Sequence, residues 1–295
     1  MNPTVFLGLV THEGTRFKSA DKPTGLIHQV SSALTERGYR TEVLISREND
    51  FEKSGVVLTQ REVVDSIQAE LRIERQWRRF VNSDDIGALQ GIKFTARHIY
   101  RRAKFAPLGR RHHLATERGA QMLRRLVNIE LAHVKLLKAA YQSGASWAMI
   151  VEDDAQLDDV ESFTSHLKTF IESQASSTTP LYLNLSDSFS HESLGLSSRL
   201  RPTGSWSPNA ALLSADRPLT NTACAILYRY EFLDILLPAL LQIPTSPVLP
   251  IDWKLNAALL DLYYRGYVKS DDCWFVSPGP IVQGSMHRQV GAYLG

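Results

Sequence analysis

Unbroken runs of apolar residues predict two strands, over residues 5–10 and 148–151. A strand with no polar position is typical of a sheet that is buried on both faces. Gly38 follows the first helical pattern, at the position where a helix C-cap is expected. Strand, helix and strand in this order predict a βαβ unit of the nucleotide-binding kind. The elements after the first strand are a polar loop over residues 11–24, a helix from Leu26 to Arg37 and a strand over residues 41–46.

The most regular helical pattern runs from Gln121 to Gln142, with apolar residues at three-to-four spacing. Glu130 and His133 lie within one turn of each other on this predicted helix and can interact. A hydrogen-bonded histidine inside the helix packing is the favoured interpretation of this pair, and a metal-binding pair is the alternative.

The strand over residues 148–151 runs directly into three acids, Glu152, Asp153 and Asp154. Unpaired charges are costly to bury, so the acids predict the point where the strand emerges at the sheet edge. In open α/β sheets ligands bind at this edge. If the extended conformation continues, Glu152 and Asp154 point to one side and Asp153 to the other. Two carboxylates on one side favour a divalent cation, and a solvated loop cap is the alternative.

A basic segment over about residues 60–118 is predicted to be an insertion containing a helix from Val63 to Val81. No acid occurs between Ile86 and Thr116, whereas arginine, lysine and aromatic residues are frequent there. Such a segment can lie on an anionic membrane surface, hold an acidic acceptor or hold nucleic acid. A solvated helical face is the plainer alternative.

The 295 residues fit one large domain, and the formal net charge of +2 gives no global field that would attract nucleic acid. Cys224 and Cys273 are too few for a disulfide framework, which favours a reducing compartment. The apolar run at residues 5–10 is too short for a signal peptide, and no run approaches the length of a membrane span. We therefore expect a cytoplasmic protein.

An ordered set of motifs resembles glycosyltransferase family 25, the lipooligosaccharide and collagen galactosyltransferase group. The set covers roughly residues 120 to 288 and has five parts. They are Ile129 to Leu137 with its alanine-histidine step, Trp147 to Asp154, Thr222 to Tyr228, Val248 to Trp253, and Val276 to Pro278 with Ile281 to Gln283 and Ser285.

The resemblance implies a GT-A-like α/β domain over residues 1–295, with a mostly parallel central sheet flanked by helices. It also implies a nucleotide-diphosphate sugar donor, expected to be a UDP-hexose, and a Mn²⁺ or Mg²⁺ cofactor. Asp154 would be the direct metal ligand, and Glu152 and Asp153 would lie near the ribose, the base or metal-bound waters. His287 is the candidate second ligand, with a surface histidine as the alternative.

The first loop and the C-terminal half supply the remaining candidate residues. Thr11, His12 and Arg16 lie where a nucleotide can be met, although an ordinary surface loop is equally compatible. An inverting transfer needs a base for the acceptor hydroxyl, and Asp252 is the candidate. Asp252 can instead cap the helix that follows it. Trp253 can stack on an acceptor sugar or pack as a helix staple.

Two further expectations concern the segment after residue 181. Asp187, at the end of a predicted strand over residues 181–185, is the weaker alternative base. The Ser-, Pro- and Gly-rich stretch from Ser186 to Asp216 predicts a mobile loop over the site.

Three hypotheses follow. The preferred one is a glycosyltransferase whose partners are a nucleotide sugar and a saccharide or glycoconjugate acceptor. A lipid-linked acceptor is an alternative within this hypothesis, as is peripheral contact with a membrane through the basic segment. The second is a nucleotidyltransferase on a similar sheet. The third is a non-enzymatic module that binds a membrane or nucleic acid through the basic segment, although the net charge favours no nucleic acid.

Overall fold

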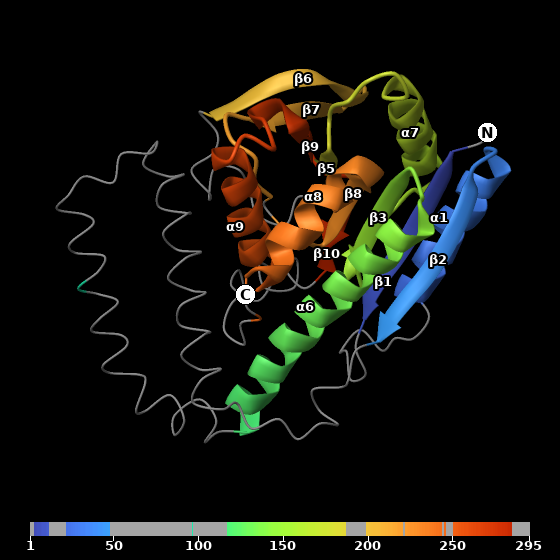
Figure 1. Cartoon of the computed structure of the whole chain (residues 1–295). Helices are drawn as coiled ribbons and strands as arrows, with labels where there is room; N and C mark the ends of the chain where they lie inside the picture. Colours follow the sequence, from blue (N-terminus) through green and yellow to red (C-terminus); the bar gives the residue numbers. More distant parts are fainter. Residues whose placement is uncertain are drawn as a thin grey trace, which may run out of the picture.

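The computed structural model describes residues 3–11, 22–47, 96, 117–186, 199–220, 222–243, 245 and 250–284. In these residues an eight-stranded sheet lies between two layers of helices (Figure 1). The strands of the sheet are β1 (Thr4–Thr11), β2 (Arg40–Arg47), β3 (Trp147–Glu152), β5 (Tyr182–Asn184), β6 (Leu200–Ser207), β7 (Ala210–Ala215), β8 (Ala225–Arg229) and β9 (Cys273–Ser277). The helices are α1 (Lys22–Glu36), α6 (Glu117–Ser143), α7 (Val160–Ser173), α8 (Tyr230–Leu241), α9 (Ile251–Tyr264) and the short 3₁₀ turn η2 (Ser270–Asp272). A separate two-stranded ribbon pairs β4 (Ala155–Gln156) with β10 (Val282–Gln283).

The strand order of the large sheet is β2-β1-β3-β8-β5-β9-β7-β6. β1 runs parallel to both β2 and β3, and β5 runs parallel to β9. β8 is antiparallel to its neighbours β3 and β5, and β7 is antiparallel to β9 and β6. Six of these eight strands therefore point in one direction, and β7 and β8 oppose them. The predicted α/β architecture is confirmed, with a sheet that is mixed.

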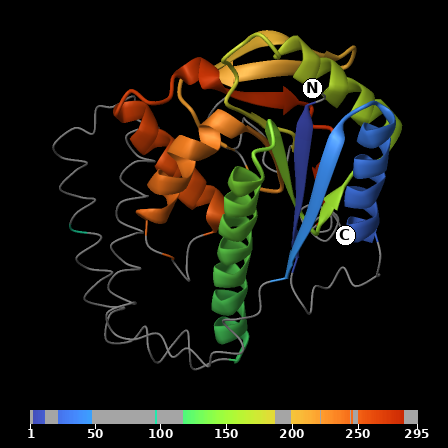
Figure 2. The same cartoon turned by 45° about the vertical axis from the view of Figure 1, so that its right-hand side comes forward.

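Alternate residues of β3 enter two different cores, as the unbroken apolar pattern predicted. Trp147, Met149 and Val151 pack on the face that α1 and α7 cover. Ala148 and Ile150 pack on the opposite face, which α6, α8 and α9 cover. Figure 2 shows α6 and α1 on opposite sides of the strands. Glu152 follows Ile150 by two residues, so its side chain belongs to the α6 side of the sheet.

The predicted helix over 121–142 is α6, which has 27 residues and is about 40 Å long at the usual rise. Gly144 ends it with a φ of +67°, and Gly38 follows α1 with a φ of +88°. Both values lie in the left-handed region, where glycine has no Cβ penalty. α6 packs closely over β1, because a Cβ on Gly8 would come within 2.7 Å of Ile150 Cδ1 and 3.3 Å of Leu136.

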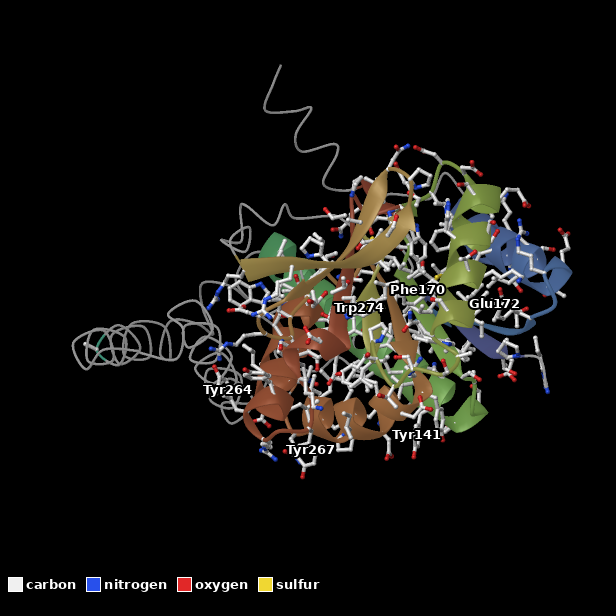
Figure 3. All side chains as sticks on the ribbon, turned by 90° about the horizontal axis from the view of Figure 1, so that it is seen from above. Tyr141, Phe170, Glu172, Tyr264, Tyr267 and Trp274 are labelled. Carbon is white, nitrogen blue, oxygen red and sulfur yellow. The ribbon has the colours of Figure 1, made fainter. Side chains whose placement is uncertain are left out.

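The expectation of one mobile loop from Ser186 to Asp216 is wrong, because β6 and β7 form an antiparallel hairpin within it. Trp206 of β6 is buried against Phe163 and Phe170 of α7, which anchors the hairpin to the helix layer. Phe170 also makes an edge contact with Trp274 of β9, and Figure 3 shows this pair beneath the hairpin. Residues 187–198 lie outside the described residues.

The basic segment over about residues 60–118 also lies outside the described residues, apart from positions 96, 117 and 118. The helix expected from Val63 to Val81 falls entirely in that region. Among the helices of the described ranges, none has the length and apolarity needed to cross a membrane.

Candidate functional site

The carboxyl ends of β1 and β3 form the switch point of the sheet. The chain leaves β1 toward β2 on one side and returns as β3 on the other side. Ligands of open α/β sheets bind in the crevice at such a point. Thr11 ends β1, and its Oγ1 donates a hydrogen bond of 3.0 Å to Asp153 Oδ2. The structure therefore brings together these two predicted donor-binding residues, whereas His12 and Arg16 lie outside the described residues.

The three acids do not continue the strand, because β3 ends at Glu152 and Asp153–Asp154 form a turn before β4. Glu152 and Asp154 are nevertheless close to each other. Carboxylate oxygens of Glu152 and Asp154 and the Sγ of Cys224 all lie within 4.8 Å of one another. Asp154 is buried, while Glu152 and Asp153 are half-buried. The acids are thus partly shielded from solvent at the sheet edge and do not form a fully solvated loop.

Glu152 is held by two polar side chains from distant parts of the chain. His133 Nε2 lies 3.0 Å from Glu152 Oε1, and Gln283 Nε2 donates to Glu152 Oε2 at 3.5 Å. His133 is buried, and its Nδ1 has no hydrogen-bond partner within the described ranges. The expected hydrogen-bonded histidine is therefore present. Sequence reasoning missed that its partner is one of the acids at the end of β3.

A second buried ion pair lies one turn away on α6. Lys254 of α9 contacts Glu130, and the side chains of both residues are almost fully buried. Neither residue was predicted as a member of the site. The sequence signal that was available is the three-residue spacing of Glu130 and His133 on the inward face of α6.

Asp252 lies in the first turn of α9, which begins at Ile251 after Pro250 as N-cap. The alternative interpretation of Asp252 as the N-cap is therefore wrong. Its Oδ1 is inaccessible to solvent and has no hydrogen-bond partner among the described residues. Burial, and secondly the charge of Glu152, raise the pKa of Asp252 to about 6. The backbone N–H groups of Trp253 and Asp252, and His133, act in the opposite direction. Trp253 itself is 39% exposed.

Cys224 approaches the same edge because β8 runs antiparallel to β3 and begins where β3 ends. Its Sγ lies 4.0 Å from Asp154 Oδ1. Burial, followed by the charges of Asp154 and Glu152, raises the pKa of the thiol well above its usual value, so the thiol is neutral. Cys273 is likewise free and buried.

A buried hydrogen-bond network holds the chain that leads into β8. Asn184 Nδ2, at the end of β5, donates to Thr220 Oγ1 at 2.6 Å and to the Thr222 carbonyl at 2.9 Å. Asn256 of α9 accepts from the Thr220 N–H at 2.7 Å. These contacts fix the segment that ends at Cys224, directly beside Asp154.

The side chains at the end of β3 fit a hard divalent cation. Two carboxylates can both reach one ion, and oxygen ligands suit Mg²⁺ and Mn²⁺, whereas a neutral thiol does not. Lys254 contacts Glu130. The Gly284 N–H donates to the Asp154 carbonyl at 2.8 Å, so the C-terminal ribbon borders the acids. His287 and Asp187, the predicted second ligand and alternative base, lie outside the described residues.

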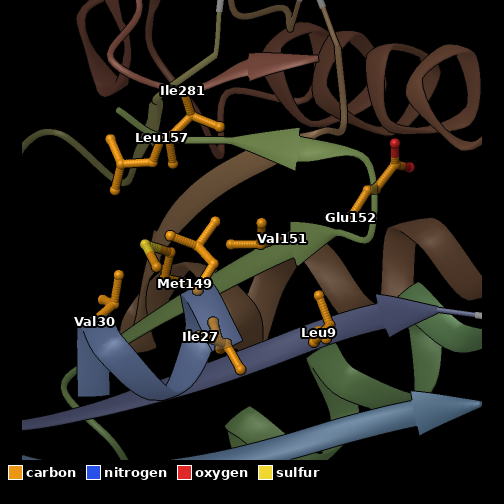
Figure 4. Close-up of a pocket in the computed structure, with 9 residues that line it drawn as sticks. Leu9, Ile27, Val30, Met149, Val151, Glu152, Leu157 and Ile281 are labelled. Atoms are coloured by element: carbon orange, nitrogen blue, oxygen red, sulfur yellow. The ribbon is translucent and has the colours of Figure 1, made fainter. Parts of the chain in front are cut away.

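A small apolar cavity lies on the other face of β3, between that strand and α1 (Figure 4). Glu152 lies at one end of it. Because almost no polar group faces it, the cavity offers a water molecule too few partners. Its lining residues are Leu9, Leu26, Ile27, Val30, Met149, Val151, Glu152, Leu157 and Ile281.

No protein-family model matches the chain, and no curated protein matches its sequence. The function is therefore inferred from the geometry of the site and from the resemblance of the motifs.

Proposed function

We propose that the protein is a metal-dependent glycosyltransferase of the GT-A type. It would transfer a sugar, expected to be a hexose from a UDP-sugar, to a hydroxyl of a saccharide or glycoconjugate. The observation that carries this proposal is the convergence of the Glu152 and Asp154 carboxylates at the carboxyl end of β3, beside the switch point. A diphosphate that binds in that crevice meets carboxylates suited to a divalent cation.

The donor side of the site is formed by the ends of β1 and β3. Asp154, supported by Glu152, would hold Mn²⁺ or Mg²⁺, with His287 as the proposed second protein ligand. When bound, the cation neutralises negative charge that develops on the departing diphosphate. The Thr11 hydroxyl donates a hydrogen bond to Asp153, which would hold this acid on the donor side. His133 and Gln283 hold Glu152 in one orientation.

The acceptor side is formed by the first turn of α9. Asp252 would take the proton of the acceptor hydroxyl as that oxygen bonds to the anomeric carbon, while the bond from that carbon to the diphosphate breaks. This single displacement inverts the anomeric centre. A pKa near 6 leaves Asp252 largely ionised at neutral pH and still basic enough to accept a proton. Trp253, exposed beside it, offers an aromatic face on which a sugar ring can stack.

The proposal is tested first by ligand-induced stabilisation and then by turnover. UDP should raise the melting temperature only when Mn²⁺ is present, because the proposed site binds the diphosphate through the cation. A ligand that binds the native state stabilises it by about 2.7 kcal/mol at a concentration of 100 times Kd. A panel of UDP-hexoses with Mn²⁺ should then release UDP. Asp154→Asn should abolish both effects, whereas Asp158→Asn, at an exposed acid four residues further on, should change neither.

Two results would contradict the proposal. An Asp154→Asn variant that keeps the Mn²⁺-dependent stabilisation and the turnover would show that the acids do not hold the cation. Release of pyrophosphate in place of a nucleoside diphosphate would indicate a nucleotidyltransferase instead.

A further inference from the structure

Helix α6 carries two buried contacts that reach opposite sides of the site. His133 pairs with Glu152 at the end of β3, on the donor side. Glu130, three residues earlier, pairs with Lys254 in α9, on the acceptor side. Residues three apart lie on the same face of a helix, so one rigid surface of α6 contacts both elements. The spacing between Glu152 and the first turn of α9 is therefore set by α6.

The stability of the fold does not by itself account for the Glu130–Lys254 pair. Both side chains are almost fully removed from solvent, at 2% and 5% exposure. Taking two charges out of water costs free energy that their attraction offsets only when the geometry is favourable. Replacement of such pairs by well-packed apolar side chains is often neutral or stabilising. The position that the pair imposes on α9 is therefore a second candidate role for it.

The position in question is that of the first turn of α9. Within the described part of the chain no side-chain hydrogen bond caps this helix, whose N-cap is Pro250. The first backbone bond of the helix, from the Lys254 N–H to the Pro250 carbonyl, is long at 3.4 Å. Lys254 and Asp252 belong to this same turn, so the contact of Lys254 with Glu130 also locates Asp252.

We propose that Glu130 and Lys254 are positioning residues, whose buried pair fixes the first turn of α9 and with it the place of Asp252. Neither residue touches the substrate in this proposal. The inference rests on the proposed function for the role of Asp252 as the base. The placement of Asp252 itself can be tested without any activity.

The first test replaces the pair by apolar side chains of similar size, in the double variant Glu130→Leu/Lys254→Met. We expect this variant to fold with an equal or higher melting temperature. The kcat for transfer to an acceptor should nevertheless fall about 100-fold, because a shift of the catalytic group by about 1 Å has an effect of this size. The donor KM and the Mn²⁺-dependent hydrolysis of the donor by water should not change. The matched control is Lys168→Met/Glu172→Leu, which removes an exposed ion pair on α7.

The second test is a double-mutant cycle that uses only melting temperatures at pH 8. Asp252→Asn removes the charge of a half-buried carboxylate, so it should raise the melting temperature of the otherwise wild-type protein. In the Glu130→Leu/Lys254→Met background, where Asp252 can turn toward water, at least half of that rise should disappear. Coupling of this kind is expected only between residues that share a local structure.

The outcomes separate the two proposals. If the wild-type protein turns over no nucleotide sugar, the proposed function fails, and the cycle still decides whether the pair places Asp252. Equal effects of Asp252→Asn in both backgrounds would overturn the positioning role. Full transfer activity in the double variant would overturn it as well, as would a double variant that does not fold, since the pair would then be needed for folding itself.

Discussion

Replacement of Asp252 by asparagine should stabilise the protein, and only at neutral and alkaline pH. In the folded protein, burial and the charge of Glu152 raise the pKa of Asp252 from 3.8 to about 6. The folded state therefore binds this proton more tightly than the unfolded chain does. Below about pH 4 Asp252 does not lower the free energy of unfolding, because the carboxyl is protonated in the folded protein. The destabilisation develops as the pH rises and is complete above about pH 6.

The size of the effect follows from the shift. A pKa that is raised by about two units corresponds to about 3 kcal/mol of destabilisation once the group is ionised. Asparagine keeps the shape of the side chain and carries no charge, so the variant should escape this cost. For a chain of 295 residues, about 3 kcal/mol at the melting temperature corresponds to a rise of about 5 °C.

Urea unfolding of wild type and Asp252→Asn at pH 4 and pH 8 would measure the effect directly. The two free energies of unfolding should agree within error at pH 4 and differ by up to about 3 kcal/mol at pH 8. Asp158→Asn, at an exposed acid, serves as the control and should show no such pH dependence. A difference that is the same at both pH values, or a less stable Asp252→Asn protein at pH 8, would refute the reasoning.

Three other substitutions test the packing around the site, each by urea unfolding. Lys254→Met alone should cost about 3–5 kcal/mol, because it removes one partner of a buried ion pair, and an unchanged free energy of unfolding would mean that the contact with Lys254 does not stabilise the fold. Gly8→Ala should cost about 1–3 kcal/mol, because its Cβ would lie 2.7 Å from Ile150 Cδ1 in the neighbouring strand; a neutral result would show that the Ile150 side chain can move aside. Asn184→Ala should cost about 1–3 kcal/mol through unpaired buried groups, and Mn²⁺ binding should weaken with it if the network supports the acids.

The parts of the fold that the sequence predicted are those with an unambiguous period. β3 has no polar residue before Glu152, so its burial on both faces and the emergence of the acids followed directly. The three-to-four spacing in α6 predicted that helix to within a few residues at each end. The hydrogen bond between Thr11 and Asp153 was not predicted, because Thr11 was expected in a loop and instead ends β1.

The β6–β7 hairpin was missed because its strands have no strand-like pattern. β6 is the edge strand of the sheet and is mostly exposed, so only Trp206 is clearly apolar and buried. β7 contains no β-branched or aromatic residue to distinguish it from a loop. The hairpin is held by tertiary contacts of Trp206 with α7, and such contacts leave no local signal.

The polar contacts of the site were missed for a related reason. His133 and Glu152 are 19 positions apart, and Glu130 and Lys254 are 124 positions apart. Helical spacing showed that Glu130 and His133 share a face of α6, but it did not show which element covers that face. Only the packing of α6 against β3 and α9 pairs these side chains, and that packing depends on the antiparallel β8 and the helices that follow it.

The alkylation rates of the two buried thiols report how often the structure around each of them opens. Cys224 and Cys273 are shielded from solvent and stay protonated, so an alkylating reagent can reach them only when the surrounding structure transiently separates. Cys224 lies against Asp154, whereas Cys273 begins β9 on the other side of β5. Local opening at the end of β3 should label Cys224 faster than Cys273. Unfolding of the whole sheet should expose both thiols together, so the ratio of the two labelling rates distinguishes these events. A divalent ion bound by Asp154 should slow the labelling of Cys224.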